Sequence, residues 1–93
     1  MYRQTGLHTI TDINDNTGTY DGFDWYISNI VLTIPRDTGT PVDTLIIVNI
    51  IDGINERAFT FDYSLEAGQG KFDMEDFYDM ILLRPEFAGS TPI

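Results

Sequence analysis

The chain has 93 residues, with 15 acidic and 5 basic side chains, no cysteine and a formal net charge of −10. Hydrophobic residues make up 42% of the chain, which is enough to form a folded core, so the acidity does not indicate disorder. The length predicts a single acidic domain over residues 1–93. Without cysteine, a disulfide framework, a thiolate nucleophile and a cysteine zinc site are excluded.

The sequence carries no signal for secretion or for crossing a membrane. Residues 1–6 lack the apolar segment of a signal peptide, and the longest apolar run, residues 45–51, is short and interrupted by Asn49. We therefore expect a cytoplasmic protein. Because a negative surface repels phosphate, the charge argues against direct binding of nucleic acid or of an anionic membrane, and it favours a basic protein as partner.

The amino-terminal third predicts a short strand followed by a loop. Residues 7–13 alternate weakly between apolar and polar types, which is typical of an edge strand. Residues 12–22 are rich in Asn, Asp, Thr and Gly, the residue types that favour turns.

Part of this loop has the spacing of a calcium site. Asp12, Asn14 and Asn16 match the first three ligand positions of an EF-hand loop, but Thr17 and Phe23 stand where that loop needs a glycine and a glutamate. We therefore favour an Asx-rich turn over a calcium site, and the sequence indicates neither a metal nor another cofactor.

The middle of the chain predicts three strands. Residues 23–34 are rich in aromatic and β-branched types and predict a strand with a bulge near Ser28. Residues 44–51 are apolar on both pleat faces, which is typical of a central strand. The dipeptide Asp52-Gly53 favours a hairpin, so we expect residues 57–65 to pair antiparallel with residues 44–51.

The last quarter predicts one helix. Apolar residues from Met74 to Leu82 recur at helical spacing, Asp73 is a good N-cap and Pro85 stops the helix, which gives a helix over residues 74–83. We expect residues 86–93 to be extended or loosely docked. The predicted class is α+β, with an antiparallel sheet of three to four strands covered on one face by a single C-terminal helix.

The other face of this sheet has two explanations. Either aromatic residues such as Phe23 and Trp25 fold over it, or the face is buried between the protomers of a homodimer.

The acidic row of the predicted helix is the first candidate binding surface. Its members are three or four positions apart and therefore neighbours on one helical surface: Asp73, Glu75, Asp76 and Asp79. Carboxylates in the first turn of a helix also stabilise the helix through its dipole, and this alternative accounts for Asp73, Glu75 and Asp76. It does not account for Asp79, which favours the binding interpretation.

The second candidate surface combines tyrosines with carboxylates. Tyr20 and Tyr26 lie near Asp21 and Asp24 in the sequence, and rings beside carboxylates suit a partner surface rich in arginine. The chain shows no catalytic set: His8 is the only histidine and belongs to no nucleophile motif. We therefore expect a protein that is not an enzyme.

The acidic helix, with Glu75-Asp76-Phe77-Tyr78, and the high negative charge of a short cysteine-free chain resemble the small acidic phage proteins that inhibit CRISPR nucleases by imitating DNA. The resemblance is to this class of protein, without an alignment of individual positions, and it involves about a fifth of the chain. It implies carboxylates that stand where DNA phosphates would stand and compete for arginine and lysine in the nucleic-acid channel of a nuclease or effector complex.

The sequence therefore predicts an acidic inhibitor that binds a nucleic-acid-handling protein in the host cell cytoplasm. The alternative is a small structural or assembly protein, such as a virion component, that self-associates through its apolar sheet and uses its acidity for solubility.

Overall fold

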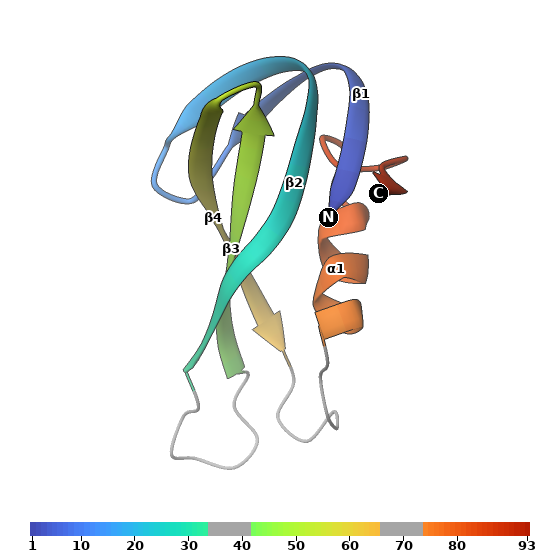
Figure 1. Cartoon of the computed structure of the whole chain (residues 1–93). Coiled ribbons are helices and arrows are strands. Elements are labelled where there is room, and N and C mark those ends of the chain that lie inside the picture. The colour runs from blue at the N-terminus through green and yellow to red at the C-terminus, as the bar shows by residue number, and fades with distance from the viewer. Residues whose placement is uncertain (34–41, 66–73) are drawn as a thin grey trace.

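The computed structural model describes residues 1–33, 42–65 and 74–93. The strands of these segments form one antiparallel sheet in the order β4-β3-β2-β1-β5, and a short helix lies beside it (Figure 1). The elements in chain order are β1 (Tyr2–Thr11), β2 (Thr17–Thr33), β3 (Val42–Asp52), β4 (Asn55–Leu65), α1 (Met74–Leu82) and β5 (Thr91–Pro92). The described part of the chain is therefore mostly sheet, with more strands than the three to four expected.

The hairpin of β3 and β4 confirms the predicted antiparallel pair. Asp52 pairs with Asn55, so the turn between them contains only Gly53 and Ile54. Gly53 has a φ of 62°, while Ile54 has no positive φ, which is the pattern of a type II′ turn and explains why a glycine stands at this position. As predicted, β3 is an interior strand, paired on its other side with β2.

Strand β2 begins earlier than the sequence predicted, because residues 17–22 belong to it and not to the loop. Thr17 and Thr19 pair with Thr11 and Thr9 of β1, and each pair brings its hydroxyl oxygens to within 3.0–3.1 Å. Cross-strand threonine pairs stabilise a sheet, and this effect outweighs the turn preference of the neighbouring residues. The predicted bulge near Ser28 is confirmed by a register shift between Ile27 and Asn29.

The turn between β1 and β2 reaches the free edge of β4. The Ile13 amide donates to the Thr60 carbonyl oxygen at 3.1 Å, and the Thr60 amide donates to Asp12 Oδ2 at 2.9 Å. Arg57 of β4 also donates to the Thr17 carbonyl oxygen, at 3.0 Å. The sheet thus curls until one hairpin contacts the opposite edge strand, and its inner side encloses the core.

The core combines the inner side of the sheet with side chains from α1 and from the segment after it. Phe77 and Ile81 of α1 are buried, as the predicted apolar stripe requires, and the helix itself is confirmed within one residue. Phe87 is fully buried, with its ring centroid 5.0 Å from that of Trp25 and 5.7 Å from that of Phe61.

Two expectations about the carboxyl-terminal end are therefore wrong. Of the two alternatives for residues 86–93, loose docking is wrong, because Phe87 fills the core and β5 pairs with β1, whereas Thr91–Pro92 are extended as expected. For the same reason α1 is not the last element. A single phenylalanine between charged and small residues gives no periodic signal, so the sequence pattern did not show this burial.

Candidate functional site

The strand register defines an outer face of the sheet, opposite the core. Paired residues in adjacent antiparallel strands lie on the same face, and Trp25, Ile50 and Phe61 lie on the inner one. The residues that alternate with these inner positions lie on the outer face, where paired residues form two rows across the strands. The outer-face ladder is Arg3, Asp24, Ile51 and Glu56, and the next row is Tyr26, Asn49 and Ala58.

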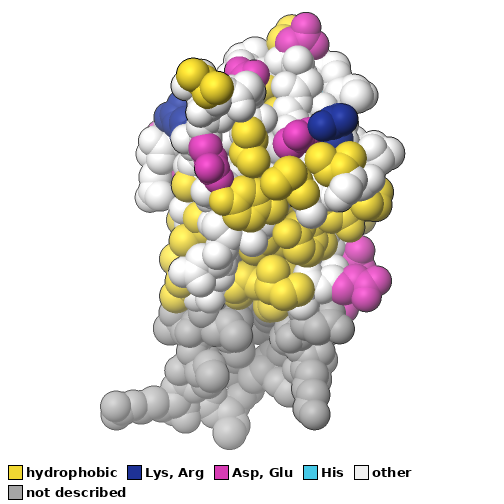
Figure 2. Space-filling view, in the orientation of Figure 1, with side chains coloured by type: hydrophobic (Ala, Val, Ile, Leu, Met, Phe, Trp, Pro, Cys, Tyr) yellow, Lys and Arg dark blue, Asp and Glu magenta, His cyan; other side chains and the backbone are white. Residues whose placement is uncertain are grey.

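None of these outer residues is fully buried, and the face is apolar in its middle. Ile47 and Leu45 of β3 are half-buried there, and Val31 is 41% exposed. Figure 2 shows apolar side chains gathered over the middle of the molecule, with carboxylates at the margins. An apolar centre with a charged rim is the usual anatomy of a protein-binding surface.

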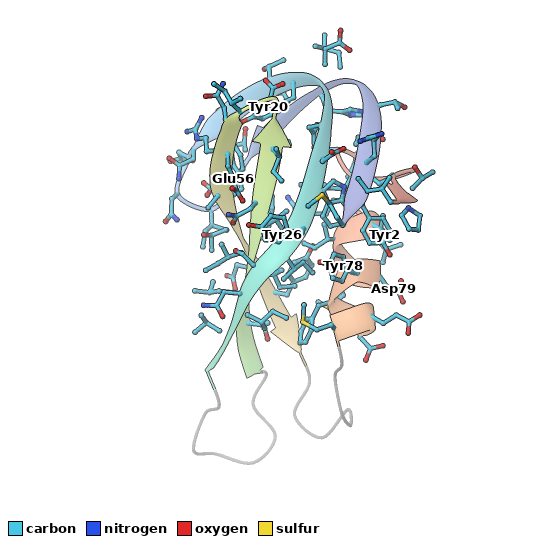
Figure 3. All side chains as sticks on the ribbon, viewed as in Figure 1. Tyr2, Tyr20, Tyr26, Glu56, Tyr78 and Asp79 are labelled. Carbon is cyan, nitrogen blue, oxygen red and sulfur yellow. The ribbon has the colours of Figure 1, made fainter. Side chains whose placement is uncertain are left out.

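Tyr26 and Glu56, labelled in Figure 3, form a hydrogen-bonded cluster with Asn49 at this surface. The Tyr26 hydroxyl donates to Glu56 Oε1 at 2.5 Å, and Asn49 Nδ2 donates to the same oxygen at 3.0 Å. The bond from Tyr26 and then that from Asn49 hold the pKa of Glu56 below its ordinary value, while the bond to Glu56 raises the pKa of Tyr26. Glu56 is therefore a fixed and charged carboxylate beside a tyrosine ring.

Arg3 and Asp24 form a bidentate ion pair in the outer-face ladder. Arg3 Nε donates to Asp24 Oδ1 at 2.8 Å and Nη2 donates to Oδ2 at 3.3 Å. These hydrogen bonds are the main cause of a pKa of Asp24 below its ordinary value. The Arg3 side chain is 58% exposed, so the pair lies at the surface.

A cavity of about 300 Å³ adjoins this ion pair. The irregular pairing of β1 with β2 between Gln4 and Leu7 and the β3–β4 turn form its walls, and both include glycines with positive φ, 80° at Gly22 and 62° at Gly53. Only a residue without a side chain adopts these backbone angles without strain. The cavity, which we call the Arg3–Asp24 cavity, is lined by Arg3, Gln4, Thr5, Gly22, Phe23, Asp24, Ile51, Asp52 and Gly53.

The acidic row of α1 forms a separate surface. Glu75, Asp76 and Asp79 are exposed, and Asp73 lies outside the described residues. Figure 3 places Asp79 on the helix, at the opposite side of the view from Glu56, with Tyr26 and Tyr78 between them. The two sets of carboxylates therefore do not form one continuous row.

The predicted tyrosine surface is divided between the two faces. Tyr20 is half-buried on the inner side, with its ring centroid 5.7 Å from Phe23 and 6.4 Å from Phe59. Asp21 is exposed. Asp24 and Tyr26 are on the outer face together with Arg3, Asn49 and Glu56, and Asp52 lines the adjoining cavity; none of the last four was a candidate site residue from the sequence.

The hairpin signal could have identified one of these missed residues. Because Asp52-Gly53 fixes the turn, it also places Glu56 of the edge strand β4 opposite Ile51 of β3. Arg3 and Asp24 could not be paired in this way, since their register depends on a bulge between Gln4 and Leu7.

The Asp12 carboxylate has a structural role in the predicted loop. Its oxygens accept hydrogen bonds from the amides of Asn14, Asn16 and Thr60, each at 2.9 Å, which is an Asx turn joined to β4. Burial alone would raise its pKa, but the hydrogen bonds from Thr60 and Asn16 and from Asn14 prevail and lower it. In residues 1–33, 42–65 and 74–93, no group of three or more His, Cys, Asp or Glu side chains is arranged to hold a metal ion.

His8 is held close to its own strand. Its Nε2 lies 2.9 Å from the Thr5 carbonyl oxygen, and its ring edge faces Phe23.

Within the described segments, no helix is both long and apolar enough to cross a membrane.

Comparison with protein-family models, with curated proteins and with solved structures found no match to this chain.

Proposed function

We propose that this chain is a non-enzymatic acidic binding protein that occupies the cationic nucleic-acid-binding surface of a nuclease or another nucleic-acid-handling protein. It acts in the cytoplasm, in the manner of the phage inhibitors that the sequence resembles. The support is that the described arginines are bound within the chain, whereas many of the described carboxylates are not.

The arginines of the described residues are all engaged within the chain. Arg3 binds Asp24; Arg57 donates to a backbone carbonyl and lies over the Phe59 ring at 5.1 Å; Arg84 binds Glu86 and lies over Phe61 at 4.2 Å. By contrast, a set of exposed carboxylates forms no hydrogen bond or ion pair within the described part of the chain: Asp15, Asp21, Asp52, Asp62, Glu75 and Asp79.

This imbalance gives the surface a negative field that the chain does not neutralise itself. Such a field attracts a cationic groove and speeds association with it, and it repels nucleic acid.

We also propose that α1 covers the inner face of the sheet together with the Phe87 segment. Phe77 and Ile81 are buried, and the Tyr78 hydroxyl accepts from the Ile27 amide at 3.0 Å, which supports this arrangement. The outer face then stays available to a partner.

The direct test is binding to a panel of nucleases and effector complexes at two salt concentrations, with DNA as competitor. We expect affinity that falls steeply with salt and a loss of binding when DNA occupies the nuclease. A flat salt response, or simultaneous binding of DNA and of this protein, would contradict the proposal.

Two double variants with the same change of charge identify the surface used. Glu56→Gln with Asp62→Asn removes two carboxylates from the outer face, and Glu75→Gln with Asp79→Asn removes two from the acidic row of α1. The variant that weakens binding more marks the contact surface, because both alter the long-range field equally.

Self-association is the second candidate function, and the apolar centre of the outer face favours it. Val31, Leu45 and Ile47 are partly exposed there, and contiguous apolar surface often marks an interface. Sedimentation of the wild type and of Ile47→Lys distinguishes the candidates. A stable oligomer that Ile47→Lys dissociates supports an assembly protein, whereas a monomer in both cases supports the acidic inhibitor.

A further inference from the structure

We propose that the Arg3–Asp24 cavity receives an arginine side chain of the partner protein. This inference rests on the proposed function and names the chemical group that is recognised. It concerns the outer face, not the acidic row of α1.

The lining of the cavity suits a guanidinium group on an aliphatic stem. Asp24 and Asp52 are the acidic residues of the lining, and Ile51, which pairs with Asp24, adds a half-exposed apolar side chain. Glu56 follows Ile51 in the same ladder, with its carboxylate fixed by Tyr26. A volume of about 300 Å³ is at the small end of ligand pockets, which fits one long side chain better than a metabolite.

Arg3 shows how a guanidinium is bound at this place. It uses two nitrogens on the two oxygens of Asp24, the geometry that arginine forms with carboxylates and lysine cannot. Because the Arg3 side chain is 58% exposed, it can leave Asp24 without opening the core. Arg3 is therefore an internal competitor for the partner's arginine.

Charge complementarity identifies the occupant. The described outer face has carboxylates at Asp24, Glu56 and Asp62, Asp52 lines the adjoining cavity, and the one arginine of this face, Arg3, is already bound to Asp24. In a two-fold dimer the same acidic face would oppose itself, which is unfavourable at a net charge of −10. A guanidinium of a basic partner satisfies the carboxylates and also stacks on rings such as Tyr26.

The test uses two probes of equal charge and the whole chain, labelled with ¹⁵N. One probe is a capped hexapeptide of alternating glycine and arginine, and the other has lysine in place of arginine. In an NMR titration at low salt, we expect the arginine peptide to bind about fivefold more tightly and to shift the amides of Gly22, Asp24 and Asp52.

Two matched pairs of variants test the roles of Arg3 and Asp52. Arg3→Gln should tighten binding of the arginine peptide about threefold, because Asp24 becomes free, whereas Asn14→Asp adds the same charge at an exposed turn and should affect both peptides equally. Asp52→Asn should weaken binding of the arginine peptide about fivefold, and Asp15→Asn, with the same charge change, should not. The same NMR spectra show that each variant is folded.

The outcomes separate this inference from the proposed function. Equal affinity for the two peptides, or shifts concentrated on α1, overturns the arginine cavity and leaves an acidic protein that binds cations through its field alone. Looser binding of the arginine peptide to Arg3→Gln also overturns it. If neither peptide binds at low salt, the proposed function fails together with the inference.

Discussion

The β1–β2 turn and the outer face both carry aspartate or glutamate in contact with backbone or side-chain donors, but they use these residues differently. Asp12 is 6% exposed, and the amides that it binds belong to its own turn and to β4. Glu56 is exposed, and its partners are the side chains of Tyr26 and Asn49. The first carboxylate joins two parts of the backbone, whereas the second is held in place at the surface, so burial and partner type separate structural acids from candidate binding acids.

Replacement of Asp12 should have the largest effect on stability. Asp12→Ala removes the acceptor of part-buried hydrogen bonds from the Thr60 and Asn16 amides and frees the turn from β4, so we expect a loss of about 2–3 kcal/mol in the free energy of unfolding. Chemical denaturation measures it. The matched control is Asp15→Asn in the same turn, where an exposed carboxylate without a partner in the described residues should change stability by less than about 0.5 kcal/mol. Equal losses in both variants would remove the distinction.

The acid side of the stability curve should show the same difference. The pKa of Asp12 is lower in the folded protein than its ordinary value of 3.8, so its contribution is complete above that value and is lost as the pH falls below it. We expect the free energy of unfolding to fall less for Asp12→Asn than for the wild type between pH 5 and pH 2, which denaturation at each pH measures. Protonation of the exposed carboxylates affects both proteins alike, so parallel curves would contradict a structural role for the charge.

A glycine variant tests whether the cavity matters apart from stability. Gly22→Ala places a side chain at a φ of 80° in the cavity wall, and Gly89→Ala does the same at a φ of 83° where an added Cβ meets nothing within 4 Å. Each should lose about 1–2 kcal/mol of stability through the backbone. Only Gly22→Ala should weaken binding of the arginine peptide, which NMR titration of both variants measures. Equal binding would place the arginine elsewhere.

The sequence predicted those elements whose signal is local. The helix over residues 74–82 follows from its apolar spacing, and the β3–β4 pair follows from its turn. Even the bulge near Ser28 was expected. These features need no knowledge of distant residues.

The parts that the sequence did not reveal depend on contacts between distant segments. Phe87 is buried because Trp25 and Phe61 surround it, and Thr17 is in a strand because Thr11 faces it. The candidate site has the same origin, since Arg3 meets Asp24 only through the register of two strands. A one-residue change of register would move such side chains to the opposite face.

The smallest effect is expected at the Tyr26 hydroxyl. Tyr26→Phe removes the donor that holds the pKa of Glu56 below its ordinary value of 4.5, so the carboxylate of Glu56 should titrate at a higher pH, while stability changes little because this hydrogen bond lies at the surface. NMR titration of the Glu56 side chain measures the first effect and chemical denaturation the second. Tyr20→Phe is the control, because its ring packs on the inner side against Phe59 and should leave the titration of Glu56 unchanged. If both variants leave it unchanged, Tyr26 does not fix the carboxylate, and the outer face presents Glu56 as an ordinary mobile acid.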